Sequence, residues 1–384
     1  MSKQYFAKSE FEDRQSKVRE AMSKAGIELL LVIAPVHINY LTGASAKGYQ
    51  EFQVLFFPLE GGPLVIQSRL AEVPMLLADS FVDEVRGWGG REPEDPIEVF
   101  REILQAQGYK GLKVGLEVPS YYLHPHHHNQ LVDLLGADLV MDATDLIGNI
   151  KLIKSPAEID YVRKAGKIVD QGMDTCIASI ESGRTERAIS ADIHHTLLAA
   201  GSDIQASPMN FLSGPRSAFA HGEPSDRVLE SGDFMHIQFG AHYRRYCVTI
   251  GRQLCLGEPT QRMWDVYQVV RDAGDACMAE MRAGVSARVP HEIAKKVIVE
   301  GGLDECRLHM TGYAVGAAFA PSWVEPLIMD AGSEYTLEAG MVIAVEPPLF
   351  GLEDGLGVRL IDNVLITQTG CERLSSTTRD LILV

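Results

Sequence analysis

His221 is the residue in this sequence that is best suited to move a proton. It lies between turns rich in serine, glycine and proline, where a side chain can project into a cleft. A neutral imidazole can take a proton from water and return it to a leaving nitrogen. We therefore expect His221 to be catalytic, as a general base and then a general acid. The alternative is a structural histidine in a loop.

Glu346 is the second candidate for chemistry. It follows the apolar run 341–345 and precedes two prolines, so the carboxylate is expected to be buried. A buried carboxylate is costly unless it is paired. We expect Glu346 to contact a cationic or hydrogen-bonding group of a substrate, and the alternative is a salt bridge to Arg252 or Arg359. No Ser or Cys lies in a convincing nucleophile motif, so water is the expected nucleophile.

Other side chains are candidates for lining the same pocket. Gln238 and His236 are two residues apart in an apparent strand and therefore share one face. Tyr313 could donate its hydroxyl to an anionic group, or fill space as an aromatic ring. Phe319 and Trp323 could close over a cationic ligand, although a tryptophan more often lies in a core or a dimer contact.

The overall composition limits the kinds of partner. The chain has 384 residues, which suits two domains, and its net charge of -17 argues against nucleic-acid binding. No stretch approaches the roughly 18 uncharged apolar residues that span a bilayer. The charged N-terminus lacks the apolar segment of a secretory signal, which indicates a cytoplasmic protein. We expect a small-molecule substrate, no nucleic acid and no membrane.

Two further features of the sequence are interpreted as structural rather than functional. The six cysteines form no C-x-x-C pair and are expected to be buried free thiols. The run of histidines at 124–128 lacks accompanying carboxylates and is interpreted as a solvated surface segment rather than a metal site.

The pattern of elements predicts a domain boundary near residue 150. Before it, helix-like and strand-like segments alternate, with strands expected at 29–33 and 54–57, which indicates an α/β domain over 1–150. After it, Ser155-Pro156-Ala157-Glu158 has the form of a capping box and predicts a long helix ending near Gly183. The second domain is assigned to 151–384.

The second domain contains a weak internal repeat. A helix pair ending near 183 and 200 is followed by another at 260–284 and 291–300, and β-type segments follow each pair at 234–256, 341–350 and 357–367. Two similar α/β halves could pack face to face around a shared site.

Several ordered motifs resemble those of the creatinase, aminopeptidase P and prolidase group. They cover nearly the whole chain: Asn39-Tyr40-Leu41-Thr42-Gly43, the segment 151–159, Ser213-Gly214 with Ala220-His221, Ser231-Gly232-Asp233, Thr311 to Gly316, Ala339-Gly340-Met341, Val345-Glu346-Pro347 and Gly357 to Asn363. The resemblance implies a pita-bread catalytic domain, a smaller amino-terminal α/β domain of the creatinase type, and a homodimer.

The resemblance also shows what this sequence lacks. The metal-dependent members use two aspartates, one histidine and two glutamates, and the matching positions here are Gln238, Thr249, Tyr313, Glu346 and Ile361. Two divalent ions about 4 Å apart repel by roughly 15 to 20 kcal/mol at an effective dielectric near 20. A single carboxylate offsets too little of that repulsion, so the sequence predicts no metal and no cofactor.

Creatinase and the hydrolase that opens the ectoine ring are relatives that resemble this case, because both work without metal. We therefore expect a metal-independent, creatinase-like hydrolase that cleaves a C–N bond other than a peptide bond, of the amidine or guanidino type, in a small zwitterionic compound. His221 and Glu346 would be catalytic, and the substrate would contact Gln238, Tyr313, His236, Phe319, Trp323 and Thr249. Gly251 and Gln238 replace carboxylates of creatinase and the ectoine enzyme, which argues against creatine or ectoine as the substrate.

Two other functions stay open at this point. One is a metal-dependent peptidase of the aminopeptidase P or prolidase type, which the fold favours and the lost ligands oppose. The other is a non-catalytic relative that binds a small molecule.

Overall fold

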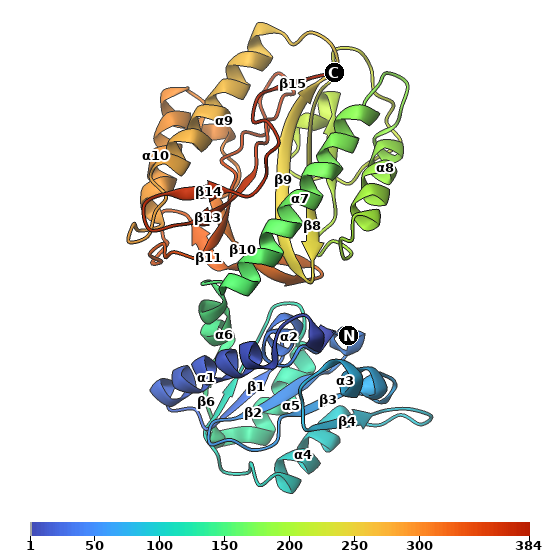
Figure 1. Cartoon of the computed structure of the whole chain (residues 1–384), viewed down its shortest axis with the longest axis vertical. Helices are drawn as coiled ribbons and strands as arrows, with labels where there is room; N and C mark the ends of the chain where they lie inside the picture. The colour runs from blue at the N-terminus through green and yellow to red at the C-terminus, as the bar shows by residue number, and fades with distance from the viewer. Residues whose placement is uncertain (1) are drawn as a thin grey trace. The chain divides into compact units, whose positions relative to one another are not determined.

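The structure, a computed structural model, describes residues 2–384 and divides into two compact units. One unit ends at Ile150 and the other begins at Lys151. Both combine helices with a sheet (Figure 1), so the predicted α/β class is confirmed. Among the described residues, no helix combines the length and the apolar character needed to cross a membrane.

The first unit is built on a six-stranded sheet in the order β4-β3-β2-β1-β5-β6. The strands are β1 (Leu29–Val32), β2 (Val54–Pro58), β3 (Val65–Arg69), β4 (Glu84–Trp88), β5 (Val114–Leu116) and β6 (Leu139–Asp142). The helices are α1 (Lys8–Ala25), α2 (Pro35–Thr42), α3 (Val73–Asp79), α4 (Pro96–Ala106), α5 (Pro125–Leu135) and α6 (Thr144–Lys151).

Strand β1 explains why this sheet is covered on both faces. Successive side chains of a strand point to opposite faces, and every residue of β1 is buried. Leu30 enters one core with Val18 of α1, whereas Leu31 enters a second core with Phe100 of α4. The continuous apolar run therefore reflects two packed layers of helices.

The histidine run 124–128 caps and begins α5, and most of its side chains are exposed as expected. His127 and His128 are partly buried, and the His127 ring lies 4.9 Å from that of Phe52. Among residues 2–384, no group of three or more His, Cys, Asp or Glu residues could hold a metal ion. The six cysteines are free thiols; four are buried, and Cys306 and Cys371 are partly buried.

The second unit has a nine-stranded sheet in which β14-β13-β12-β10-β9-β8-β7 are neighbours, β11 pairs with β10 and β15 pairs with β9. The strands are β7 (Asn210–Ser213), β8 (Phe234–Tyr243), β9 (Tyr246–Cys255), β10 (Gly312–Phe319), β11 (Ser322–Met329), β12 (Val342–Val345), β13 (Asp362–Ile366), β14 (Cys371–Arg373) and β15 (Ile382–Leu383). The helices are α7 (Pro156–Ser179), α8 (Glu186–Ala199), α9 (Gln261–Ala279) and α10 (Arg288–Glu300).

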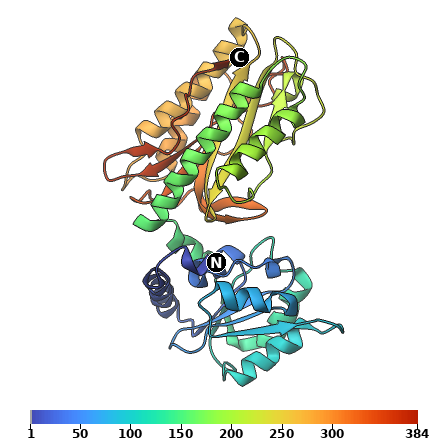
Figure 2. The same cartoon turned by 45° about the vertical axis from the view of Figure 1, so that its right-hand side comes forward.

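The two helix pairs of this unit lie beside different parts of the sheet (Figures 1 and 2). Helix α7 packs on β8 and β9, with α8 beside it, and α9 packs on β12 with α10 beside it. The predicted capping box of α7 is present, because Ser155 and Glu158 exchange side-chain and backbone hydrogen bonds. The helix ends at Ser179, a few residues before the predicted end.

The segment predicted as one β-type region, 234–256, is a hairpin. Strands β8 and β9 pair in register from Phe234 opposite Cys255 to Tyr243 opposite Tyr246. Arg244 and Arg245 form the turn with φ angles of 53° and 73°. These left-handed conformations usually favour glycine or asparagine, so two arginines carry no signal for the turn.

Candidate functional site

A cavity of about 160 Å³ in the second unit collects most of the candidate residues. Its walls come from the start of β7 and the segment before it, from the β7–β8 connection and from β8. The segment before β10, the β10–β11 hairpin and the residue after β12 complete them. The lining residues are Ser207, Asn210, His221, Gln238, His309, Met310, Tyr313, Ser322, Trp323, Val324 and Glu346. Five of the residues predicted from the sequence therefore meet in one cavity: His221, Glu346, Gln238, Tyr313 and Trp323.

Glu346 directly follows β12, and its side chain is almost fully buried. His309 Nδ1 lies 3.1 Å from Glu346 Oε1, and Glu346 Oε2 has no hydrogen-bond partner among the described residues. Burial raises the pKa of Glu346 to about 7, although the charge of Arg359 and the Tyr313 hydroxyl oppose that shift. A carboxyl group with this pKa can both accept and release a proton near neutrality.

His309 is the neighbour that connects Glu346 with His221. Its Nδ1 also lies 3.2 Å from the carbonyl oxygen of Met310, which can only accept a hydrogen bond. The His309 ring centroid is 5.5 Å from that of His221. Burial lowers the pKa of His309, so the imidazole is neutral at physiological pH.

His221 lies at the exposed side of the cavity, in the segment between β7 and β8. The surrounding protein and, second, the charge of Arg359 lower its pKa to about 4. Solvent that reaches the ring weakens this shift, but the direction makes His221 a neutral group at physiological pH. At this pH the neutral ring can form hydrogen bonds, but it is only a weak base.

Tyr313 and Trp323 form the aromatic wall of the cavity. They face each other from the paired strands β10 and β11, and Trp323 Nε1 donates a hydrogen bond of 3.1 Å to the Tyr313 hydroxyl oxygen. Burial and the nearby Glu346 raise the pKa of Tyr313 well above its usual value. The phenol therefore stays protonated.

Gln238 is held by two neighbours rather than left free. Its Oε1 accepts hydrogen bonds from Asn210 Nδ2, at 3.1 Å, and from Arg359 Nη1. Arg359 is buried, and its guanidinium also donates to the carbonyl oxygen of Ala220. The alternative salt bridges of Glu346 to Arg252 or Arg359 are not formed: Glu346 contacts His309, and Arg252 pairs with Asp362 at 2.9 Å.

Three predicted substrate-binding residues do not line the cavity. His236 Nε2 lies 3.1 Å from the carbonyl oxygen of Ser217, and its side chain is fully buried. Phe319 is buried beneath the guanidinium of Arg245, 4.1 Å from the ring centroid. Thr249 is also buried, and its hydroxyl accepts a hydrogen bond from Asn363. His236 lies on the same face of β8 as Gln238, but its side chain does not line the cavity.

Sequence reasoning missed His309, which is the nearest partner of Glu346. A signal was present, because His309 precedes Thr311-Gly312 at the start of β10. The family resemblance places a metal-binding histidine at Tyr313, four residues after His309. Ser207, Asn210, Met310, Ser322 and Val324 were also missed, and their residue types carry no comparable signal.

The structure tests whether the five positions that resemble metal ligands could hold two ions. Gln238 is bonded to Arg359, Thr249 to Asn363, and Tyr313 to Trp323. Ile361 faces Gly251, where an added Cβ would lie only 2.6 Å from the Ile361 side chain. Only Glu346 offers a carboxylate, so the residues present do not fit a two-metal centre.

The α/β units and this cavity define a two-domain pita-bread protein. Residues 160–368 match the model of metallopeptidase family M24, and residues 14–153 match the creatinase/prolidase N-terminal domain. The first match covers more than half of the chain, so the chain belongs to metallopeptidase family M24.

Relatives of this chain match it from end to end. It is 28% identical over 375 residues to the Xaa-Pro dipeptidase of Pyrococcus horikoshii, which spans 96% of this chain and 99% of the relative. The solved prolidase of that organism has a TM-score of 0.84 at 27% identity, over 96% of this chain and all of the other. A prolidase from Thermococcus sibiricus has a TM-score of 0.88 at 26% identity, over 97% and 99% of the two chains.

These comparisons confirm the predicted superfamily and both of its domains, but they correct the predicted function. The expectation of a creatinase-like, metal-independent hydrolase of non-peptide C–N bonds is wrong. Two relatives that match the chain from end to end carry the name Xaa-Pro dipeptidase, which denotes cleavage of a peptide bond, and the family is one of metallopeptidases. The error has a physical reason: missing ligands indicate what a site cannot hold, but they do not identify the bond that it cleaves.

Proposed function

We propose that this chain binds Xaa-Pro dipeptides in the cavity around His221 and Glu346 and cleaves their peptide bond. The observation that carries the proposal is the end-to-end match to the Xaa-Pro dipeptidase of Pyrococcus horikoshii, at 28% identity over 96% of this chain. The cavity supports it, because polar groups able to move a proton lie beside an aromatic wall.

The roles of the chain's own residues follow from their proton affinities. Glu346, with a pKa of about 7, is the group best matched to take a proton from the water that attacks the carbonyl carbon and to return it to the prolyl nitrogen as the C–N bond breaks. His309 orients that carboxyl group from 3.1 Å. His221, whose pKa lies at about 4, donates or accepts a hydrogen bond at the substrate rather than acting as the base. The Tyr313 hydroxyl and Trp323 hold the proline ring.

A second function is favoured by a different observation. The described part of the chain has no group of metal-binding side chains, although the family is named for metallopeptidases. This agrees with a protein that binds a dipeptide without cleaving it.

One experiment separates the two functions. Purified protein is incubated with Ala-Pro, with and without added Mn²⁺, Co²⁺ or Zn²⁺, and free proline is measured by mass spectrometry. Binding of Ala-Pro is measured in parallel by calorimetry. Proline release that is lost in Glu346→Gln supports the peptidase, and binding without release supports the binding protein. Absence of both rejects both functions.

Two expectations from the sequence stay predictions. The homodimer implied by the family resemblance is tested by light scattering on the purified chain, which should give twice the mass of one protomer. The cytoplasmic location is tested by fractionation of the native cells.

A further inference from the structure

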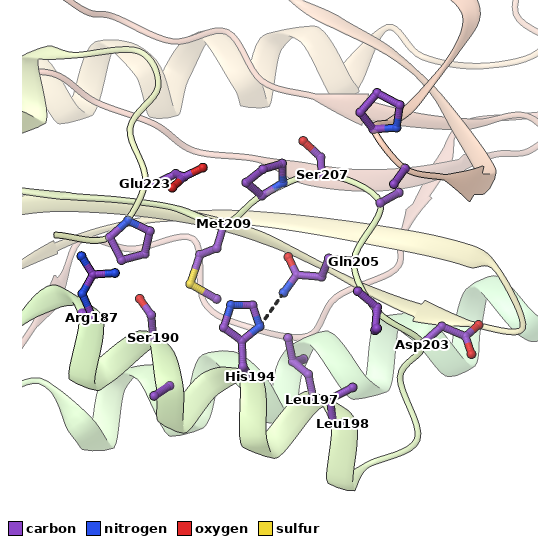
Figure 3. Close-up of a pocket in the computed structure, with 17 residues that line it drawn as sticks. Arg187, Ser190, His194, Leu197, Leu198, Asp203, Gln205, Ser207, Met209 and Glu223 are labelled. Carbon is purple, nitrogen blue, oxygen red and sulfur yellow. Dashed lines mark hydrogen bonds between the residues drawn. The ribbon is translucent and has the colours of Figure 1, made fainter. Parts of the chain in front are cut away.

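A second, larger cavity lies between α8 and the segment that leads into β7 (Figure 3). Its volume is about 680 Å³. The helix contributes His194, Leu197 and Leu198, and the segment contributes Gln205, Ser207 and Met209. This cavity is separate from the residues to which the proposed chemistry is assigned.

The two cavities share walls. Ser207 lines both, and consecutive residues divide between them: Met209 lines the larger cavity and Asn210 the smaller one. The same holds in the β10–β11 turn, where Pro321 lines the larger cavity and Ser322 the smaller one. The larger cavity therefore adjoins the site on the side of Ser207.

The volumes indicate that a ligand uses both spaces. Ligand pockets usually measure about 300 to 1,000 Å³. The smaller cavity, at about 160 Å³, falls below that range, whereas the larger one, at about 680 Å³, lies within it. A dipeptide whose reacting bond lies near Glu346 has adjacent space for a large side chain.

The chemistry of the larger cavity favours an apolar group. Leu198 and Ile204 line it although they are 55% and 82% exposed, so both offer apolar surface that the described chain leaves uncovered. Several polar groups of the wall already have partners: Gln205 and His194 hydrogen-bond to each other at 3.3 Å, and Arg187 pairs with Asp226 at 2.7 Å. Two carboxylates also line the cavity, Glu223 and Asp203, and Asp203 Oδ2 accepts a hydrogen bond of 2.8 Å from the backbone N–H of Arg245. Both disfavour an acidic side chain of a ligand at this wall.

We propose that the larger cavity is the specificity pocket for the first residue of the dipeptide and selects a large apolar side chain, such as phenylalanine or leucine. This inference rests on the proposed function, since it assigns the Xaa side of an Xaa-Pro substrate. The proline ring lies in the smaller cavity, and the apolar side chain of Xaa passes Ser207 toward Leu198 and Met209.

The test compares the affinities of Phe-Pro and Gly-Pro by calorimetry. Apolar contacts of this kind change recognition by roughly tenfold to a hundredfold. We expect the wild-type protein to bind Phe-Pro at least about tenfold more tightly than Gly-Pro. Leu198→Glu, which places a charge in the cavity, should reduce the ratio of the two affinities toward one. If the new charge weakens the binding of both dipeptides equally, the ratio of their affinities does not change.

Val299→Glu is the matched control. Val299 lies near the end of α10, as Leu198 lies near the end of α8, and is 49% exposed but lines neither cavity. Its variant should keep the wild-type ratio. Circular dichroism melting of both variants verifies that the fold is intact.

The outcomes separate this inference from the proposed function. Equal affinities for Gly-Pro and Phe-Pro, or a ratio that Leu198→Glu leaves unchanged, overturn the specificity pocket and leave the dipeptide site intact. If a large apolar side chain increases affinity only as the third residue of a peptide, as in Gly-Pro-Phe, the assignment of the cavity to Xaa is wrong. If neither dipeptide binds, both proposals are wrong.

Discussion

His309 Nδ1 lies 3.1 Å from Glu346 Oε1, so a neutral imidazole supports the one carboxylate among the residues that line the site cavity. A neutral N–H dipole this close to a carboxyl group favours its ionised form. This contact gives His309 a positioning role.

Replacing His309 with phenylalanine should raise the pKa of Glu346 further, because the variant keeps a ring but loses the donor. The measurement is the ¹³C chemical shift of the Glu346 carboxyl carbon as a function of pH. The wild-type midpoint is expected at about pH 7. The variant's midpoint should be higher, and a conservative His309→Asn variant, which keeps an N–H donor, should restore part of the difference. Identical midpoints in wild type and His309→Phe would exclude the role.

Glu346→Gln should stabilise the protein in a pH-dependent way. The folded-state pKa of about 7 lies above the ordinary value of 4.5, so ionisation of Glu346 opposes folding. This cost to the free energy of unfolding is absent below pH 4.5, grows as the pH rises toward 7 and is constant above it. The difference between the two pKa values corresponds to a cost of up to roughly 3 kcal/mol.

Urea unfolding at about pH 5 and about pH 8 measures this difference, and the gain should be larger at the higher pH. Glu334→Gln removes an exposed carboxylate and serves as the control. It should change the free energy of unfolding by less than about 0.5 kcal/mol at either pH. A gain for Glu346→Gln that does not depend on pH would contradict the assigned pKa.

His242 should make the protein sensitive to acid. It is fully buried, and burial first and Arg245 second lower its pKa to about 3. Its stabilising neutral form is retained above the unfolded-state pKa, and stability is lost as the pH falls from about 6.5 toward 3. Between about pH 7.5 and 5, the free energy of unfolding of His242→Asn should therefore fall by roughly 2 kcal/mol less than that of the wild type.

The measurement is the free energy of unfolding at both pH values for each protein. His195→Asn is the control, because His195 is an exposed histidine of the same unit. It should follow the wild-type curve. If His242→Asn shows the same acid sensitivity as wild type, protonation of His242 does not contribute to acid unfolding.

Several elements were predictable because their signals are local. The capping box of α7 depends on Ser155 and Glu158, which are close in sequence, and the apolar run of β1 reports burial on both faces. The β8–β9 turn was not predictable, since Arg244 and Arg245 adopt conformations that their side chains do not favour. There the pairing of two long strands overrides local preference.

Residues of the site could be predicted from the sequence only where the type of side chain itself indicates a chemical role. Glu346 and His221 stand out as ionisable groups, and both line the cavity. The choice between Gln238 and His236 could not be made from the sequence. They share one face of β8, and His236 is held away from the cavity by the carbonyl oxygens of Ser217 and Phe219, whose positions depend on the fold of the β7–β8 connection.

Ile361→Glu should destabilise the protein rather than restore a metal ligand. Ile361 is fully buried, and its backbone pairs with that of Gly251. An unpaired carboxylate at this position should cost at least about 3 kcal/mol in the free energy of unfolding. Ile361→Val, the control, should cost about 0.5 to 1.5 kcal/mol. Both are measured by urea unfolding, with and without Zn²⁺; a zinc-dependent gain in Ile361→Glu would show that the position still accepts a ligand.

The fit between Gly251 and Ile361 has a consequence for substitution at both positions. A side chain at position 251 is blocked by Ile361, and an acid at position 361 would have to enter a space already shaped by its neighbours. Neither change is accessible alone without loss of stability. The packing therefore couples the two positions, because an acidic residue at 361 would need a second substitution that opens space beside it.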